Sequence, residues 1–147
     1  MRPSQLLGTS VLLVACCVPL NVAQAHDLAG DCATLPQHAS AEANPAAITA
    51  GATLSTCAGE TVTVAANEPI PNLPGKRLVS LIVDYDPGAS SAAHRHADSA
   101  FIYAFVLSGV IRSRVDDDPV QIYKPGDAWF EKPGAHHGVS ANASTTE

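Results

Sequence analysis

The sequence predicts an all-β fold for residues 73–147, organised as a jelly roll. Short runs of β-branched and bulky residues follow one another after Lys76, and turns that contain Gly or Pro separate them at fairly regular intervals. No segment shows a sustained helical period with caps, and no repeat is visible. Many short strands separated by such turns favour a sandwich or a barrel, and a double-sheet jelly roll is the usual way to close such a set.

Six strands are expected in this region. The run from Val110 to Val115 alternates apolar or small residues with Arg112 and Arg114, which is typical of a strand with one wet face. Asp86-Pro87-Gly88 is one of the turns that end such runs. The expected strands cover residues 78–85, 100–107, 110–115, 120–123, 128–131 and 137–140.

The first 25 residues have the layout of a secretory signal peptide. Arg2 supplies a positive charge, residues 6–18 are almost wholly apolar, and Ala23-Gln24-Ala25 offers a small-residue cleavage site. Cleavage after Ala25 predicts a secreted or periplasmic protein that begins at His26. An alternative is lipidation at Cys16, because Leu13-Val14-Ala15-Cys16 resembles a bacterial lipobox. The apolar run is short of the ~20 residues that span a bilayer, so no membrane span is expected.

Residues 26–72 are rich in Ala, Thr, Asn and Pro and poor in aromatic residues, which indicates an extended arm or linker. Within the arm, Glu60–Ala66 alternates like one short strand that could pair along the edge of the following domain. Cys32 and Cys57 would remain after cleavage, and in an oxidising compartment they are a candidate disulfide, with two free thiols as the alternative.

Charge limits the partners of this chain. The net charge is −6, and loss of the leader would remove Arg2 and no acid. The basic residues are scattered, so nucleic acid is not expected as a partner.

The histidines of the predicted barrel fall at two places, His94-Arg95-His96 and His136-His137. Two histidines at positions i and i+2 of an extended strand point to the same face and can reach one ion without strain. A third histidine from a distant strand would complete a metal site. Imidazole suits Zn, Fe, Ni and Cu, whereas the scarcity of nearby carboxylates disfavours Ca and Mg.

At these residues the sequence resembles the cupin superfamily. Gly88, five further residues and His94-Arg95-His96 fit the first cupin motif, which Gly109 closes. The family expects a Glu where this chain has Ala100 or Phe101. Residues that follow the second motif, with small shifts of spacing, are Gly126, Pro133-Gly134, His137 and Asn142.

The resemblance implies a small double-stranded β-helix with a signal peptide, in which His94, His96 and His137 are the metal ligands. His136, Glu131 and Tyr103 are then candidates for the surrounding shell, and Glu131 or a water could supply a fourth ligand. In the alternative, His136 is the metal ligand and His137 lies in the surroundings of the site. Without the Glu, the site is similar to that of the three-histidine cupins, which implies Fe(II), with Mn, Ni or Zn as alternatives.

We therefore expect an exported metal-dependent enzyme of dioxygenase type that acts on a small organic molecule. A non-catalytic cupin that binds or senses a small ligand is the alternative, because fold does not select a reaction. Cupins ordinarily continue into a final apolar strand, which this sequence lacks. Either the arm strand near Val62–Val64 closes the barrel, or an open edge favours a homodimer.

Overall fold

The computed structural model describes residues 8–18, 49–57 and 59–146, and in these residues it contains strands and turns but no helix. The strands are β1 (Thr9–Val18), β2 (Thr53–Cys57), β3 (Glu60–Pro69), β4 (Arg77–Tyr85), β5 (His94–Arg95), β6 (Phe101–Ser108), β7 (Ile111–Val115), β8 (Gln121–Tyr123), β9 (Ala128–Glu131) and β10 (His136–Asn142).

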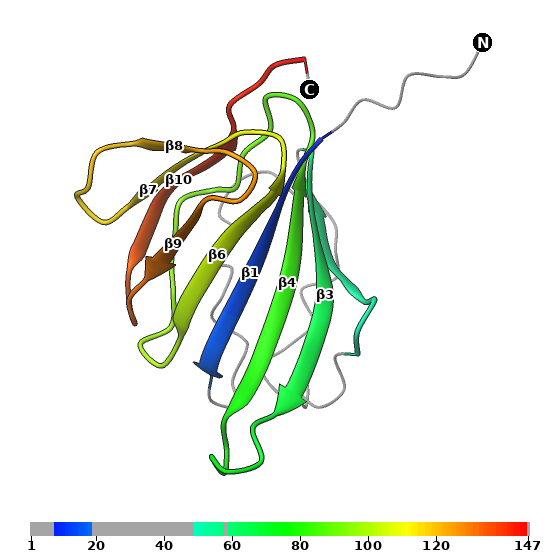
Figure 1. Ribbon diagram of the computed structural model, residues 1–147, viewed down its shortest axis with the longest axis vertical. Helices are drawn as coiled ribbons and strands as arrows, with labels where there is room; N and C mark the ends of the chain where they lie inside the picture. Colours follow the sequence, from blue (N-terminus) through cyan, green and yellow to red (C-terminus); the bar gives the residue numbers. More distant parts are fainter. Residues whose placement is uncertain (1–7, 19–48, 58, 147) are drawn as a thin grey trace.

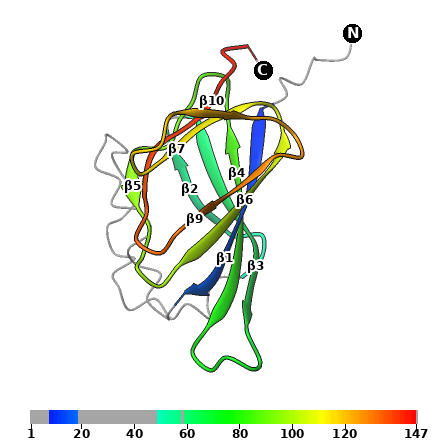
Figure 2. The same ribbon diagram turned by 60° about the vertical axis from the view of Figure 1, so that its left-hand side comes forward.

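Two antiparallel sheets form the fold, as Figure 1 shows. The larger sheet has the order β2-β3-β4-β1-β6-β9, and the smaller sheet has the order β5-β10-β7-β8. The chain passes from one sheet to the other after β4, β5, β6, β8 and β9, so neighbours in sequence often lie in different sheets. Figure 2 shows the smaller sheet facing the larger one across the interior. This arrangement confirms the predicted jelly roll.

The six strands expected after Lys76 are all present. β4, β6, β7, β8, β9 and β10 match the predicted ranges to within a few residues at each end. β5 is an addition of two residues that pairs with β10 and contains His94. β10 is the last strand in the described part of the chain.

The predicted arm also contributes to the larger sheet. β3 begins at Glu60 as expected, extends to Pro69 and pairs antiparallel with β4 over most of its length. Val62 and Val64 are each 1% exposed, because alternate residues of this strand point into the interior. Of the two arrangements that the sequence left open, the structure therefore shows the one in which the arm strand joins the sheet.

The segment with the layout of a leader contains β1, which lies between β4 and β6 in the middle of the larger sheet (Figure 1). Its register runs from Thr9 opposite Tyr85 to Val18 opposite Arg77, and on its other side from Ser10 opposite Ser108 to Cys16 opposite Phe101. Val11 is 2% exposed and packs in the core. A run of β-branched and apolar residues suits a central strand as well as it suits a leader.

The core lies between the sheets. Its members come from five strands of the larger sheet and from β7 of the smaller one: Val11, Val62, Val83, Tyr85, Ala104, Val106, Ile111 and Trp129.

No helix in the described residues is long and apolar enough to cross a membrane. Cys32 lies outside the described residues, so its pairing with Cys57 stays a prediction.

Tyr85 places a hydroxyl group inside this core. Its Oη is 2.5 Å from Ser91 Oγ and 2.8 Å from Ser140 Oγ, and Ser91 Oγ in turn donates to the buried carboxylate of Glu60. Burial raises the pKa of Tyr85 to about 12, against the lowering effect of the two serine hydroxyl groups. The network ties β3 and β4 to β10 across the two sheets.

This shift predicts a stability that depends on pH in the alkaline range. The raised pKa means that folding favours the neutral phenol, so its contribution is complete below pH 10 and is lost as pH rises through about 12. Two pKa units correspond to on the order of 3 kcal/mol. We expect the free energy of unfolding of the wild type, measured in urea, to fall between pH 10 and 12. In Tyr85→Phe the free energy of unfolding should fall less steeply with pH over the same range. Equal slopes for the two proteins would contradict the assignment to Tyr85.

Candidate metal centre

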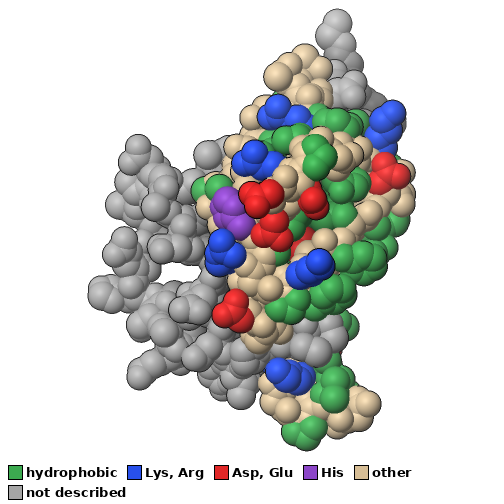
Figure 3. Space-filling view, turned by 90° about the vertical axis from the view of Figure 1, so that its left-hand side faces the viewer, with side chains coloured by type: hydrophobic (Ala, Val, Ile, Leu, Met, Phe, Trp, Pro, Cys, Tyr) green, Lys and Arg blue, Asp and Glu red, His purple; other side chains and the backbone are tan. Residues whose placement is uncertain are grey.

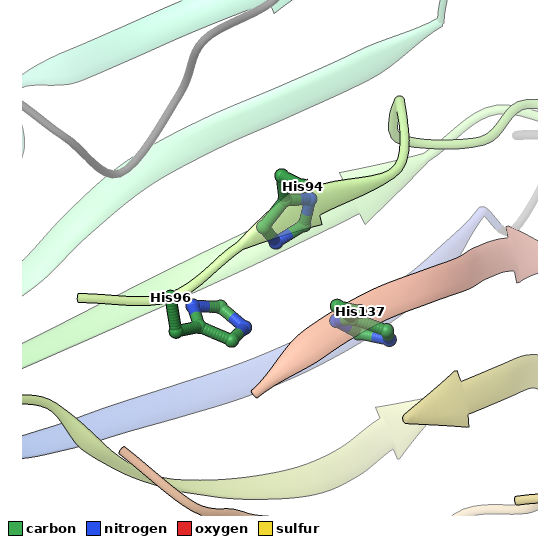
Figure 4. Close-up of side chains that lie close together, drawn as sticks. All are labelled: His94, His96 and His137. Carbon is green, nitrogen blue, oxygen red and sulfur yellow. The ribbon is translucent and has the colours of Figure 1, made fainter. Parts of the chain in front are cut away.

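The pairing of β5 with β10 brings the two histidine clusters together. His94 lies opposite His137 in the antiparallel register, and Arg95 lies opposite His136. Side chains that are directly opposite share a face of the sheet, so His94 and His137 point into the barrel while Arg95 and His136 point away. His96 follows β5 and adds the third ring, and Figure 4 shows the three side chains beside one another.

One potential ligand nitrogen from each of His94, His96 and His137 lies within 4.8 Å of the others. The ring centroid of His94 is 4.8 Å from the ring centroid of His96 and 5.4 Å from that of His137. The His96 ring is edge-on to the His94 ring, and the His137 ring is tilted relative to it. His137 is 3% exposed, whereas His94 and His96 are partly buried. The cluster therefore has a closed inner side and a more open outer side.

Hydrogen bonds orient two of the rings, and in His94 the hydrogen bond also fixes which nitrogen can bind a metal. His94 Nδ1 is 2.8 Å from the carbonyl oxygen of Ala92, which can only accept, so Nδ1 carries the proton and the lone pair is on Nε2. His137 Nε2 is 2.8 Å from Ser113 Oγ, which is buried on β7. When Nε2–H donates to this hydroxyl oxygen, the lone pair of His137 is on Nδ1. Such partners orient ligand imidazoles in metal sites.

A carboxylate lies against two of the three rings. Glu131 on β9 is completely buried, its Oε2 is 2.7 Å from His96 Nε2, and its Oε1 is 3.3 Å from His137 Nδ1. Trp129 Nε1 donates to Glu131 Oε1 over 3.0 Å. Trp129 and Glu131 are two residues apart on one strand and therefore share its inner face.

The protonation states fit metal binding. Burial lowers the pKa of His94, and it lowers the pKa of His137 to about 4, so both rings are neutral at pH 7. Burial raises the pKa of Glu131, but the contact with His96 and the electrostatic interaction with His137 lower it by more, and the net pKa lies below the ordinary value. Neutral imidazole and ionised carboxylate are the forms that bind metals.

Two buried polar atoms support the fit of a metal ion more directly. His96 Nε2 and Glu131 Oε2 are close together, yet neither atom makes a hydrogen bond of acceptable geometry within the described part of the chain. Buried polar atoms are normally satisfied, because an unmade hydrogen bond costs about 1–3 kcal/mol. A cation bound by both atoms would satisfy them, and a donor set of imidazole and carboxylate suits a divalent transition metal.

The other candidate residues lie elsewhere. The His136 side chain is half-exposed on the outer face, and its backbone N–H donates to Asp116 Oδ1 over 2.8 Å. Figure 3 shows a histidine at the surface of this side of the molecule, surrounded by acidic and basic side chains. The structure does not bring Tyr103 to the histidines. This side chain alternates with the buried Ile102 and Ala104 and packs on the outer face against Phe105 and Phe130.

The sequence patterns did not identify Trp129 and Ser113 as residues of the site. Both hold a site residue in place, Trp129 through Glu131 and Ser113 through His137. A signal for the first was present, because Trp129 and Glu131 alternate with Ala128 and Phe130 in a short strand. A polar residue on the inner face of such a strand needs a buried partner.

Comparison with known proteins agrees with this picture. Residues 81–147 match a family model described as "Cupin domain". This range begins within β4 and includes all of the histidines and Glu131 described above. Neither the curated proteins nor the solved structures gave a match to the chain.

Proposed function

Residues 81–147 form a cupin domain, and from this premise we propose that His94, His96 and His137 together hold one divalent transition-metal ion. The observation that carries the proposal is the convergence of three imidazole nitrogens within 4.8 Å from two separate strands. Polar groups already fix the rings of His94 and His137, so the site is largely formed before an ion binds.

Iron is the metal that we favour, with Mn, Ni and Zn as alternatives. Three imidazole ligands leave open coordination positions on an octahedral ion, as in the facial sites of non-haem Fe(II) oxygenases. His94 and His96, which are less buried than His137, form the side of the cluster through which a small molecule could approach. When bound, such an ion supplies Lewis acidity and one-electron chemistry that no side chain of the cluster supplies.

We propose further that the protein is a metal-dependent oxidoreductase of dioxygenase type acting on a small organic molecule. On the inner side of the cluster, Trp129 lies edge-on to His137 with 6.4 Å between ring centroids, beside the buried side chains of Glu131 and Ser113. A dry inner wall keeps competing water away from a reactive centre. Oxygen consumption by the iron-loaded protein, measured with panels of small thiols, acids and phenols, tests this step. Stoichiometric metal without turnover of any of them would instead favour the alternative, a cupin that binds or senses a small ligand.

The metal proposal predicts about one equivalent of transition metal in protein purified without chelators. His94→Ala removes a ligand whose hydrogen bond to Ala92 lies on the far side of the ring, so we expect loss of most of the metal with little change in the fold. Arg112→Ala, an exposed change on β7, is the control and should keep the metal. Elemental analysis and far-UV circular dichroism are the measurements. A folded wild type that takes up none of Fe, Mn, Ni or Zn would exclude the proposed function.

Export and self-association stay proposals. Export with cleavage after Ala25 rests on the leader-like sequence, and it would remove β1 from the larger sheet. N-terminal sequencing of protein recovered from the cell envelope or medium tests it. A homodimer is the partner that we propose besides the small molecule, because both sheets retain edge strands that can pair. A monomeric mass in solution would contradict the dimer.

A further inference from the structure

The carboxylate of Glu131 is buried beside the histidines, and support of the fold alone does not explain why a charged group lies there. Its side chain is completely buried, and one of its oxygen atoms has no hydrogen-bond partner among the described residues. Burial of a carboxylate without compensation is costly, so its retention in the interior calls for a positive partner. No Lys or Arg forms an ion pair with Glu131 in the described chain, and its near neighbours are His96 and His137.

The two oxygen atoms of Glu131 have different surroundings. Oε1 accepts a hydrogen bond from the Trp129 indole, which fixes the carboxylate plane. Oε2 is directed at His96 Nε2 and lies 2.7 Å from it without hydrogen-bond geometry. Two adjacent ligand atoms of one ion, each about 2.0–2.2 Å from it, are about 3 Å apart when they subtend a right angle. The distance between Oε2 and Nε2 is close to this separation.

The strand register places Glu131 next to the position where a cupin Glu is expected. Glu131 on β9 lies opposite Ile102 on β6, two residues beyond Ala100. Ala100 is 6% exposed, so its small side chain faces the interior on the same side as Ile102. The Glu131 carboxylate therefore enters the interior from the strand that pairs with β6, near the point where β6 begins.

We propose that Glu131 is the fourth protein ligand of the metal centre and binds through Oε2, with Trp129 as the positioning residue. The inference rests on the proposed metal-binding function and deepens it. The chain would then carry a three-histidine, one-carboxylate set in which the carboxylate comes from β9, on the second motif, rather than from β6, on the first. The site keeps fewer open positions for substrate than a site with three histidines alone.

Co(II) binding provides the test, because both its affinity and its visible absorption respond to the ligand set. Glu131→Gln preserves the shape of the side chain and removes the charged ligand. We expect a changed Co(II) spectrum and affinity weakened by more than about 100-fold, beyond the roughly tenfold to 100-fold effect of losing an outer-shell partner. Glu60→Gln is the matched control, since Glu60 is also buried but contacts Ser91, and it should leave spectrum and affinity unchanged.

A relocation experiment separates ligation from support of the fold. Glu131→Ala should lose the Co(II) spectrum of the wild type, and Glu131→Ala combined with Ala100→Glu should recover much of it, because the carboxylate returns from the adjacent strand. Trp129→Phe should weaken binding by roughly tenfold while keeping the spectrum. Wild-type affinity and spectrum in both Glu131 variants would overturn the proposal without affecting the three-histidine site.

The wild-type chain provides a measurement that does not depend on the folding of variants. Ligation of a carboxylate changes its infrared stretching bands, so the difference spectrum between Co(II)-loaded and metal-free protein should show one perturbed carboxylate. Absence of such a change in protein that has bound one equivalent of Co(II) would overturn the role of Glu131. Absence of Co(II) binding by the wild type would instead refute the proposed function on which the inference rests.

Discussion

Replacing His137 by alanine is expected to abolish stoichiometric metal binding and to weaken the affinity for added Co(II) or Fe(II) by at least about 1,000-fold. His137 is the most buried of the three rings, and it contacts both Ser113 and Glu131. Its loss removes a ligand, takes away the buried hydrogen-bond partner of Ser113 Oγ and removes one of the two histidines beside Glu131. Metal titration monitored by competition with a chromophoric chelator measures the change.

His136→Ala is the control for this experiment, because it removes the same chemical group from the next position of β10. The side chain of His136 points to the opposite face, and the hydrogen bonds of this residue with Asp116 are made by its backbone N–H and carbonyl groups, which the substitution keeps. We expect this variant to bind metal like the wild type. Equal losses of metal affinity in the two variants would mean that the substitutions act through β10 as a whole. A loss of metal affinity in His136→Ala alone would mean that His136, and not His137, is the metal ligand.

The second large effect concerns β1. Gly109 has φ +70°, and a Cβ atom there would lie 2.2 Å from Thr9 Oγ1 and 2.7 Å from Thr9 Cα. Gly126 also has a positive φ, +95°, but no other atom lies within 4 Å of its Cβ position. The loss of unfolding free energy in Gly126→Ala therefore measures the backbone strain alone, about 1–2 kcal/mol. The loss in Gly109→Ala contains the same strain and, in addition, the steric clash with β1. In urea unfolding we expect Gly109→Ala to cost at least about 2 kcal/mol more.

A chain that begins at His26 completes this test. It lacks β1, so the edges of β4 and β6 lose their shared neighbour, and we expect its unfolding free energy to fall by on the order of 5 kcal/mol or more. The difference between the two glycine variants should vanish in this chain, because Thr9 is gone. Undiminished stability of the shorter chain would mean that the sheet closes without β1, and it would strengthen the interpretation of residues 1–25 as a removable leader.

Strands and histidines could be predicted because their signals are local. Period-two alternation and turn residues define β7 and its neighbours, and the His-x-His spacing places His94 and His96 on one face. The contribution of Glu131 depends on which strands are neighbours, and only the register of β6 with β9 shows that it lies beside Ile102. Sequence patterns carry little information about such a non-local pairing.

The assignment of residues 9–18 was ambiguous for a different reason. A signal peptide and a central β-strand both need an uncharged run of apolar and β-branched residues, and this run is of a length that suits either. The small residues of Ala23-Gln24-Ala25 pointed to a leader, whereas the structure pairs β1 on both sides. Periodicity could not separate the two roles, because the sequence of this run is apolar at nearly every position and shows no alternation to detect.

β5 is only two residues long, and beyond it the bridge between Ser90 and Ala141 also joins this part of the chain to β10. The connection between β4 and β6, which presents two of the three histidines, therefore depends for its position on its backbone hydrogen bonds to β10 and the residues beside it, such as Ser91 N–H to Ser140 O and His96 N–H to Ala135 O. An ion held by His94, His96 and His137 would act as a crosslink between that connection and the smaller sheet. Such an ion would add to the contacts that already hold the entrance to the barrel, so chelation would lower the local stability of the rim while the core between the sheets stays folded.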